Sequence, residues 1–184
     1  MQLKDKLRKK YLSIRKKKYF EINKDFFIPL TKLIKKQNKK KNINLSFYYP
    51  SFFETNVLKI FKTNLKNKIR SFLPVLSKNN SMNFYQWNNK EVLQINKFGM
   101  LEPIMKLKPI IPEIILVPLL AYDNKKNRLG YGKGFYDRFL KKYLKKNNNI
   151  LTIGIAFSFQ KHHKLPISNN DVKLNFILTE KGIF

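Results

Sequence analysis

The sequence predicts an α/β fold, a three-layer α/β/α domain with a mostly parallel central sheet and a basic N-terminal helix. Segments with strand and helix periodicity alternate along the 184 residues, as they do in sheets flanked by helices. Two of the strand segments, residues 114–122 and 150–157, are apolar throughout, which is typical of parallel strands covered on both faces. Neither an internal repeat nor a splitting linker is visible, so residues 1–184 are predicted to form a single domain.

The N-terminal helix is predicted over residues 2–24. Its apolar stripe consists of Leu3, Leu7, Tyr11 and Ile14. Beside this stripe, Lys4, Arg8 and Arg15 share a second stripe at spacings of four and seven residues. Like charges at these spacings repel, so the second stripe is expected to face either an anion or plain water. Water is the default in so lysine-rich a chain, but arginine is scarce in it.

The other elements follow in order along the chain. Helices are predicted over residues 26–36 and 54–66, with a strand between them over 44–49 that ends at Pro50. Strands are predicted over 68–76 and 82–87, a loop over 98–103, and a buried strand over 114–122. A helix begins near Gly134, and strands follow over 150–157 and 176–179. In such folds ligands bind at the carboxyl ends of the strands, and a glycine-rich segment follows the strand 114–122 there.

That segment, residues 128–138, reads Arg-Leu-Gly-Tyr-Gly-Lys-Gly-Phe-Tyr-Asp-Arg. Gly130, Gly132 and Gly134 can adopt positive φ angles and let consecutive backbone N–H groups converge on an anion. The positive end of the following helix would face the same anion. A tight turn is the alternative, but a turn needs fewer glycines and no cations beside them. No Ser or Thr follows Lys133, so this is not a Walker A loop. We predict a nucleotide phosphate site.

The net charge of +28 and an isoelectric point near 10.2 would favour a nucleic-acid partner. Only five of the 39 cationic residues are arginines, however, and lysine and asparagine are in excess along the whole chain. Proteins that read nucleic-acid grooves depend on arginine, whereas a spread lysine excess is typical of a compositional bias on solvated faces. We therefore expect no specific nucleic acid as partner, and a basic RNA-binding protein is the alternative.

Cysteine, histidine and hydropathy exclude further classes. The chain has no cysteine, which excludes disulfides, thiolate metal sites and a cysteine nucleophile. Its two histidines, His162 and His163, lie in a polar stretch and are interpreted as solvated loop residues. The N-terminus lacks the apolar core of a secretory signal, and the most apolar run, residues 110–122, is too short to span a bilayer. We expect a soluble cytoplasmic protein without a membrane partner.

These motifs together resemble the 5-formyltetrahydrofolate cyclo-ligase family. The core of the resemblance is Val117-Pro118-Leu119-Leu120-Ala121-Tyr122-Asp123 followed by residues 128–138. The supporting motifs, in the family's order, are Lys4 with Arg8, Tyr49-Pro50 with Glu54, Leu73-Pro74, Phe98-Gly99 with Glu102-Pro103, residues 154–157 with Gln160, Leu165-Pro166, Asp171 and Thr179-Glu180. The resemblance covers nearly the whole chain and is thinnest over residues 20–45.

The resemblance implies an enzyme that closes 5-formyltetrahydrofolate, with or without a polyglutamate tail, to 5,10-methenyltetrahydrofolate, with ATP and Mg²⁺ as cofactors. ADP and phosphate would be released after the formyl oxygen is phosphorylated and N10 attacks. The ATP-binding residues that it implies are Lys4, Arg8, Arg128, Leu129, Gly130, Tyr131, Gly132, Lys133, Gly134, Phe135 and Tyr136. The folate-binding residues are Tyr49, Glu54, Tyr131, Gly132, Lys133, Gly134 and Phe135. Asp137 and Asp171 would bind the metal, and Lys133 and Arg128 would act in catalysis.

Some single residues have a second interpretation. Asp171 would equally form a turn after Asn169 and Asn170. Tyr49 would serve as a strand-end aromatic and Glu54 as an acid at a helix N-terminus. Trp87 is expected in the core, with stacking on the pterin as the alternative.

The chain also departs from the family's pattern at three positions. Phe135 stands where the family often has tyrosine, Asn170 where histidine is frequent, and Asn175 where aspartate is common. Many relatives also carry glycine or arginine near Tyr131 and Lys133. An inactive family member is therefore a further alternative. A monomer is expected.

Overall fold

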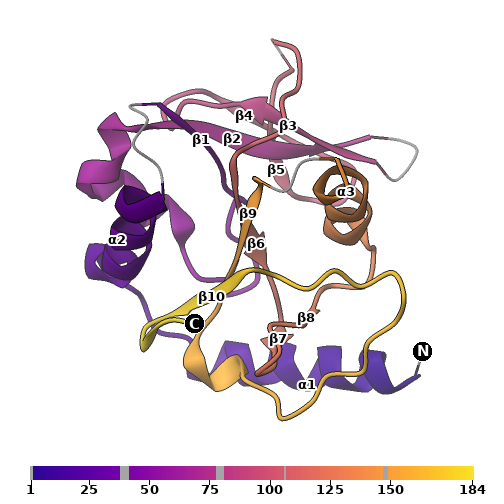
Figure 1. Ribbon diagram of the computed structural model, residues 1–184. Coiled ribbons are helices and arrows are strands. Elements are labelled where there is room, and N and C mark those ends of the chain that lie inside the picture. The colour runs from indigo at the N-terminus through magenta and orange to yellow at the C-terminus, as the bar shows by residue number, and fades with distance from the viewer. Residues whose placement is uncertain (1, 38–41, 78–80, 106, 147–148) are drawn as a thin grey trace.

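The computed structural model describes residues 2–37, 42–77, 81–105, 107–146 and 149–184 (Figure 1). The helices are α1 (Gln2–Lys18), α2 (Ile28–Gln37) and α3 (Phe135–Leu144), and the 3₁₀ turns are η1 (Lys24–Phe27), η2 (Val57–Lys62), η3 (Asn64–Asn67) and η4 (Ser158–Gln160). The strands are β1 (Ile43–Ser46), β2 (Ile69–Leu76), β3 (Met82–Gln86), β4 (Leu93–Ile95), β5 (Leu101–Pro103), β6 (Ile114–Pro118), β7 (Ala121–Tyr122), β8 (Arg128–Leu129), β9 (Leu151–Ile155), β10 (Phe176–Thr179) and β11 (Gly182–Ile183).

Seven of these strands form one sheet in the order β11-β10-β9-β6-β1-β2-β3. The inner pairs are all parallel, and only β11 and β3 join the edges in the antiparallel direction. Two antiparallel hairpins, β4–β5 and β7–β8, lie outside this sheet. The predicted α/β fold with a mostly parallel sheet is therefore confirmed.

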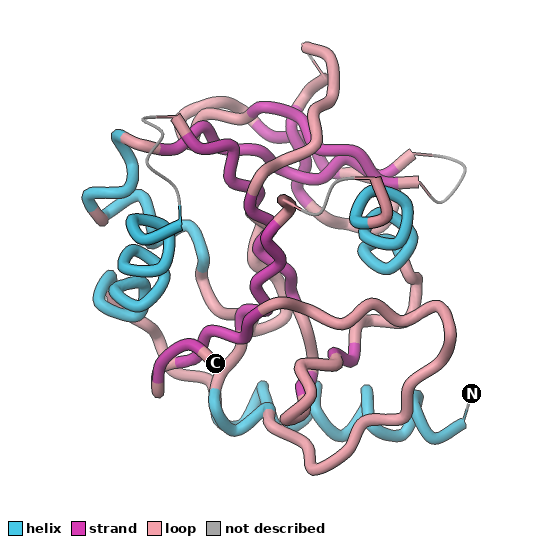
Figure 2. The backbone as a smooth tube through the Cα atoms, in the orientation of Figure 1, coloured by secondary structure: helices cyan, strands magenta, loops and turns pink. Residues whose placement is uncertain are grey.

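Helices cover both faces of the sheet. Side chains alternate along each strand, so the buried strands present apolar side chains to both faces. On β6, Leu116 packs on the same side as Leu30 of α2. Ile115 and Val117 point to the opposite side, where Phe139 of α3 packs. Figures 1 and 2 place α2 and α3 on opposite sides of the central strands. The three-layer arrangement follows from this apolar alternation.

Helix α1 lies below the sheet in Figure 1, beside β7 and β8, and covers neither face. Leu7 and Tyr11 pack against Leu120, Ala121 and Leu129 at the β7–β8 hairpin. This contact places the cationic stripe of α1 beside the glycine-rich segment, which leaves β8 directly.

The prediction that the first helix extends to residue 24 was wrong, since α1 ends at Lys18. The chain turns toward η1, where the side chain of Asn23 accepts a hydrogen bond from Asp25 N at 2.9 Å. The rings of Tyr19 and Phe20 pack on Phe157, with centroids 5.9 and 4.7 Å away. This aromatic packing holds the segment after α1 extended.

Other short elements also differ from prediction. The predicted helix over 54–66 was wrong, since this segment holds the 3₁₀ turns η2 and η3. Asn56 caps η2 through Leu58 N, and Thr63 caps η3 through Leu65 N. Residues 101–103, predicted as loop, pair with β4. The predicted strand 114–122 divides into β6 and β7. β8 and β11 were not predicted.

Candidate active site

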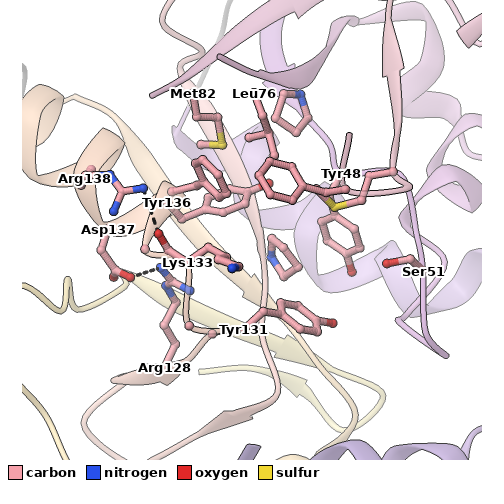
Figure 3. A pocket seen from close by; sticks show the side chains of 18 of the residues that line it. Tyr48, Ser51, Leu76, Met82, Arg128, Tyr131, Lys133, Tyr136, Asp137 and Arg138 are labelled. Carbon is pink, nitrogen blue, oxygen red and sulfur yellow. Dashed lines mark hydrogen bonds and ion pairs between the residues drawn. The ribbon is translucent and has the colours of Figure 1, made fainter. Parts of the chain in front are cut away.

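A cavity of about 810 Å³ opens where β1 and β6 end. Its walls come from the chain after β1, from β2 and β3, from the glycine-rich segment and from α1 (Figure 3). All the site residues predicted from sequence line it: Lys4, Arg8, Tyr49, Glu54, Arg128, Leu129, Gly130, Tyr131, Gly132, Lys133, Gly134, Phe135, Tyr136, Asp137 and Asp171. Residues up to 167 positions apart in sequence thus share one hollow.

The three glycines of the segment differ in backbone conformation. Gly132 and Gly134 adopt positive φ angles of 100° and 68°, as expected, whereas Gly130 does not. At Gly130 the missing side chain matters for another reason, because a Cβ there would lie 2.6 Å from Nη1 of Arg128. At Gly132 a Cβ would lie 3.2 Å from Cζ of Arg8. Glycine lets two arginine side chains lie against this backbone.

Lys4 and Arg8 reach the cavity from α1. Arg8 Nε donates to the carbonyl of Gly130 at 3.0 Å, and Lys4 Nζ pairs with Asp171 Oδ2 at 2.5 Å. Burial raises the pKa of Asp171, but the hydrogen bonds from Lys4 and from Ser168 N outweigh it, so the pKa is lowered. Asp171 also ends a turn after Asn169 and Asn170, but the backbone bond from its N–H to Ser168 O at 3.0 Å closes this turn, whereas the second interpretation expected an Asx-type turn closed by a side chain.

Arg128 and Asp137 form the ion pair drawn in Figure 3, with 2.8 Å between Nη2 and Oδ2. The Arg128 side chain is only 4% exposed, and its Cζ lies 5.8 Å from the ring centroid of Tyr136. Asp137 Oδ1 accepts a hydrogen bond from Val172 N at 3.2 Å. This bond places the start of α3 beside Asp171, so the two carboxylates predicted to bind metal come from adjoining segments.

Lys133 lies between the two left-handed glycines, and Figure 3 places it at the same hollow as Arg128 and Tyr131. Its ammonium group has no partner within the described part of the chain, whereas its carbonyl accepts from Arg138 Nη2 at 2.8 Å. Gly134 is the N-cap of α3 and offers no side chain to the first N–H groups of the helix. These N–H groups and the unpaired ammonium favour an anion here.

Glu54 is a buried carboxylate on the cavity wall, 7% exposed. Its Oε1 accepts a hydrogen bond from the Tyr131 hydroxyl, and its Oε2 accepts one from Ser51 N at 2.9 Å. Burial raises the pKa of Glu54, and the Tyr131 bond and the charge of Arg15 only partly offset this effect. Burial and then the charge of Glu54 hold the pKa of Tyr131 well above its usual range. Tyr131 is therefore the proton donor of the pair.

Two features of the site were not predicted. Arg15, expected to face water or an anion, is 1% exposed and bonds the Tyr131 hydroxyl. Phe52 and Phe53 adopt positive φ angles of 46° and 61° in a tight turn that Glu54 N closes onto Ser51 O at 2.9 Å. Such a turn normally carries glycine or asparagine, so no residue type in the sequence signals it. Phe52 is 69% exposed and lines the cavity.

Comparison with known proteins assigns the family. The model of the 5-formyltetrahydrofolate cyclo-ligase family matches residues 1–180. The chain belongs to this family. The 5-formyltetrahydrofolate cyclo-ligase of Haemophilus influenzae is 34% identical over 148 residues, which cover 77% of each chain. The solved structure of the 5,10-methenyltetrahydrofolate synthetase of Aquifex aeolicus is 30% identical, with a TM-score of 0.73 over 98% of this chain and 91% of that one. The synthetase of Mycoplasma pneumoniae is 26% identical, with a TM-score of 0.70 over 96% and 98%.

Two residues that carried the resemblance to the cyclo-ligase family lie outside the cavity lining. The buried carboxylate of Asp123 accepts hydrogen bonds from Lys125 N, Asn127 N, Asn127 Nδ2 and Leu165 N at 2.9 to 3.2 Å. Gln160 Nε2 donates to the carbonyls of Leu119 and Leu120, both at 3.0 Å. These bonds fix the β7–β8 hairpin from which the glycine-rich segment leaves. Both residues therefore shape the site without touching its contents.

Trp87 lies in the core as preferred, and His163 is exposed as expected, whereas His162 is half-buried against Tyr11. Trp87 is 4% exposed in the core, with its ring centroid 6.1 Å from that of Phe61. His162 Nδ1 lies 3.0 Å from the Tyr11 hydroxyl, and neither histidine lines the cavity.

Magnesium requires oxygen ligands and commonly binds through one or two carboxylates together with substrate phosphates and water. Asp137 and Asp171 fit that pattern, since both line the cavity beside the predicted phosphate site. Within the described residues, no cluster of three or more acidic, histidine or cysteine side chains could hold a metal by itself.

In the same part of the chain, no helix has the length and apolar character of a membrane span.

Proposed function

We propose that this chain catalyses the ATP-dependent closure of 5-formyltetrahydrofolate to 5,10-methenyltetrahydrofolate, with release of ADP and phosphate. Family membership supports an ATP-dependent cyclo-ligase. One observation of the molecule carries the proposal furthest. The residues assigned to the nucleotide and those assigned to the folate line a single cavity. Within it, the Tyr131 hydroxyl of the glycine-rich segment donates a hydrogen bond to Glu54, which is assigned to the folate.

The reaction needs a poor leaving group to be activated. The formyl oxygen attacks the γ-phosphorus of ATP, the bond to ADP breaks, and an iminium phosphate forms. N10 then attacks the formyl carbon and releases its proton to solvent, and phosphate leaves as the ring closes to the methenyl cation. Such phosphoryl transfer depends on positioning and charge neutralisation more than on a protein nucleophile, which suits a chain without cysteine.

The glycine-rich segment would hold the triphosphate. In the proposal, backbone N–H groups near Gly132 and Gly134, the unpaired ammonium of Lys133 and the cations of α1 neutralise it. Arg128 orients the segment through Asp137 and adds charge beside the transferred group. The hydroxyl of Tyr136 is buried on the cavity wall and has no partner among the described residues. An unsatisfied buried hydroxyl is costly, so a polar atom of a bound substrate is its expected partner.

Glu54 would recognise the pterin. A carboxylate offers about four lone-pair positions. Tyr131 donates to Oε1, and Ser51 donates to Oε2 through its N–H at 2.9 Å and through its hydroxyl at 3.4 Å. One position on Oε1 is then left for one pterin donor, and the second donor would displace the longer bond from the Ser51 hydroxyl. Tyr49, 36% exposed at the cavity wall, is assigned to the same ligand.

Asp137 and Asp171 would hold magnesium. Bound there, the ion would supply neutralisation of phosphate charge. Without it, Arg128 and Lys4 hold the two carboxylates in place.

The test is a spectrophotometric assay of the purified chain with ATP, magnesium and 5-formyltetrahydrofolate, in which absorbance of the methenyl product is followed. Product that depends on both substrates supports the proposal, and no product from folded protein refutes it. Binding to RNA that falls steeply with salt, without nucleotide turnover, would favour a nucleic-acid role instead. The cytoplasmic location, the monomeric state, the single domain and the use of polyglutamylated substrate stay predictions.

A further inference from the structure

Arg15 is the most buried charged side chain in the described part of the chain, at 1% exposure. Its Nη2 donates to the Tyr131 hydroxyl at 2.8 Å, its Nη1 makes a longer contact of 3.4 Å to Leu119 O, and its Cζ lies 5.6 Å from the Tyr131 ring centroid. Its Nε is buried without a partner within the described residues. Burial of a guanidinium is costly unless the charge is compensated.

The negative charge that compensates Arg15 is on Glu54, and Arg15 reaches it through the Tyr131 hydroxyl. No carboxylate of the described residues forms an ion pair with Arg15 directly. Tyr131 accepts from Arg15 and donates to Glu54, so the three side chains form a relay from α1 through the glycine-rich segment to the turn after β1. A hydroxyl that accepts from a cation becomes a stronger donor to a carboxylate.

We propose that Arg15 is a positioning residue for folate binding: through Tyr131 it fixes the carboxylate of Glu54 and keeps it ionised. This inference rests on the proposed function, because it takes Glu54 as the folate ligand. It extends that function to a residue that is absent from the cavity lining and reaches the site only through Tyr131.

The proposal differs from a purely structural role for the buried cation. If Arg15 served packing alone, a methionine of similar length would be neutral or stabilising. Folate binding would then be unaffected. In a relay, removal of the cation lets Glu54 protonate at higher pH, and a protonated carboxyl cannot accept from both pterin donors. The groups facing Glu54 are Arg15, Tyr131, Tyr48, Tyr136 and Ser51.

The experiment compares Arg15→Met with Arg70→Met, an exposed arginine outside the cavity lining. Initial rates and equilibrium folate binding are measured over a pH series, with the melting temperature as a check of folding. For Arg15→Met we expect a folate KM about tenfold higher, a much smaller change in the ATP KM, and loss of folate affinity beginning at higher pH. Arg70→Met should match the wild type in all three.

Tyr131→Phe gives the second arm, since it removes the hydroxyl while Arg15 stays. It should raise the folate KM by a similar factor. The double variant, Arg15→Met with Tyr131→Phe, should raise the folate KM little more than either single change does. Folded Arg15→Met with wild-type folate affinity and pH profile overturns the proposal. If Arg15→Met does not fold, wild-type folate affinity in Tyr131→Phe overturns it. A wild-type chain that makes no product would instead refute the proposed function.

Discussion

The guanidinium of Arg8 lies against Gly132 so closely that a Cβ on this glycine would sit 3.2 Å from Arg8 Cζ. A helix residue near the N-terminus and a loop residue 124 positions later thus pack so closely that a side chain on the glycine would push the guanidinium away by a few tenths of an ångström. The contact joins two parts of the predicted phosphate site. It also gives a direct test of whether that site depends on their approach.

Gly132→Ala should raise the ATP KM about tenfold and lower the melting temperature. Alanine at a φ of 100° is strained by about 1–3 kcal/mol, and its methyl group displaces Arg8. The matched control is Gly99→Ala, because Gly99 has a φ of 73° but no atom within 4 Å of an added Cβ. The control should lose stability and keep its ATP KM. Equal ATP KM values in the two variants would contradict the role of the contact.

Lys133→Ala should lower kcat on the order of hundredfold while the melting temperature stays unchanged. Its ammonium makes no bond within the described residues, so the fold loses little, whereas the transferred phosphate loses a cation. Steady-state kinetics and thermal melting measure the two effects. Lys10→Ala on the exposed side of α1 is the control. A kcat within twofold of the wild type would remove Lys133 from the catalytic machinery.

Asp137→Asn should impair both stability and turnover. It leaves Arg128, only 4% exposed, beside a neutral partner, and the lost charge-assisted bond is worth on the order of 2 kcal/mol. Turnover should fall about hundredfold, because both Arg128 and the proposed magnesium lose their carboxylate. Thermal melting and a magnesium titration of the rate report on these separately. Unchanged magnesium dependence at full activity would argue against the metal assignment.

The sequence predicted this site because its chemistry is concentrated in contiguous segments. Three glycines and four charged residues within residues 128–138, and a cationic stripe on one helix, can be recognised without tertiary information. The sequence does not show which of these cations becomes buried, because burial of Arg15 depends on Tyr131, which lies 116 positions further along the chain. The resemblance assigned Lys4 and Arg8 to ATP and gave Arg15 no role, and only the fold shows that Arg15 is buried against Tyr131.

For the fold, too, the elements with a contiguous sequence pattern were predicted, and those that depend on tertiary contacts were missed. The apolar segments around β6, β9 and β10 were recognised because burial on both faces gives them an unbroken apolar character. The β4–β5 hairpin was missed, since its strands are short and partly exposed and their pairing depends on Glu102, which accepts from Asn96 Nδ2 at 2.9 Å. The turn at Phe52 and Phe53 was missed because its conformation opposes local preference and is held by Glu54.

Asp123→Asn should destabilise the protein at neutral pH. Burial raises the pKa of Asp123, but hydrogen bonds from Asn127, Leu165 and Lys125 outweigh it and lower the pKa. A carboxylate with a depressed pKa stabilises the fold above its unfolded pKa of about 3.9, and the contribution is lost as pH falls through the folded value. The variant should therefore lose about 2 kcal/mol at neutral pH and less below pH 4. Equal losses at both pH values, from denaturant unfolding, would contradict this.

Glu54→Gln should separate stability from activity. Because burial raises the pKa of Glu54, the folded state binds its proton more tightly than the unfolded state does. This group's contribution to stability is thus highest below the unfolded pKa of about 4.3 and falls as pH rises through the folded pKa. Glutamine removes that loss, but it also removes the negative charge that compensates the buried Arg15, so the variant should melt close to the wild type at neutral pH.

Folate binding should weaken in this variant, because the amide offers one acceptor where the pterin presents two donors. We expect the folate KM to rise on the order of hundredfold, with the ATP KM nearly unchanged. Glu91→Gln, an exposed carboxylate outside the cavity lining, is the control for the substitution. A Glu54→Gln variant that melts lower and still binds folate normally would reverse the assignment and make Glu54 a structural cap of the Ser51 turn. A variant that melts close to the wild type and binds folate weakly is the result that a ligand-binding carboxylate requires, since its burial is unfavourable until the substrate donors arrive.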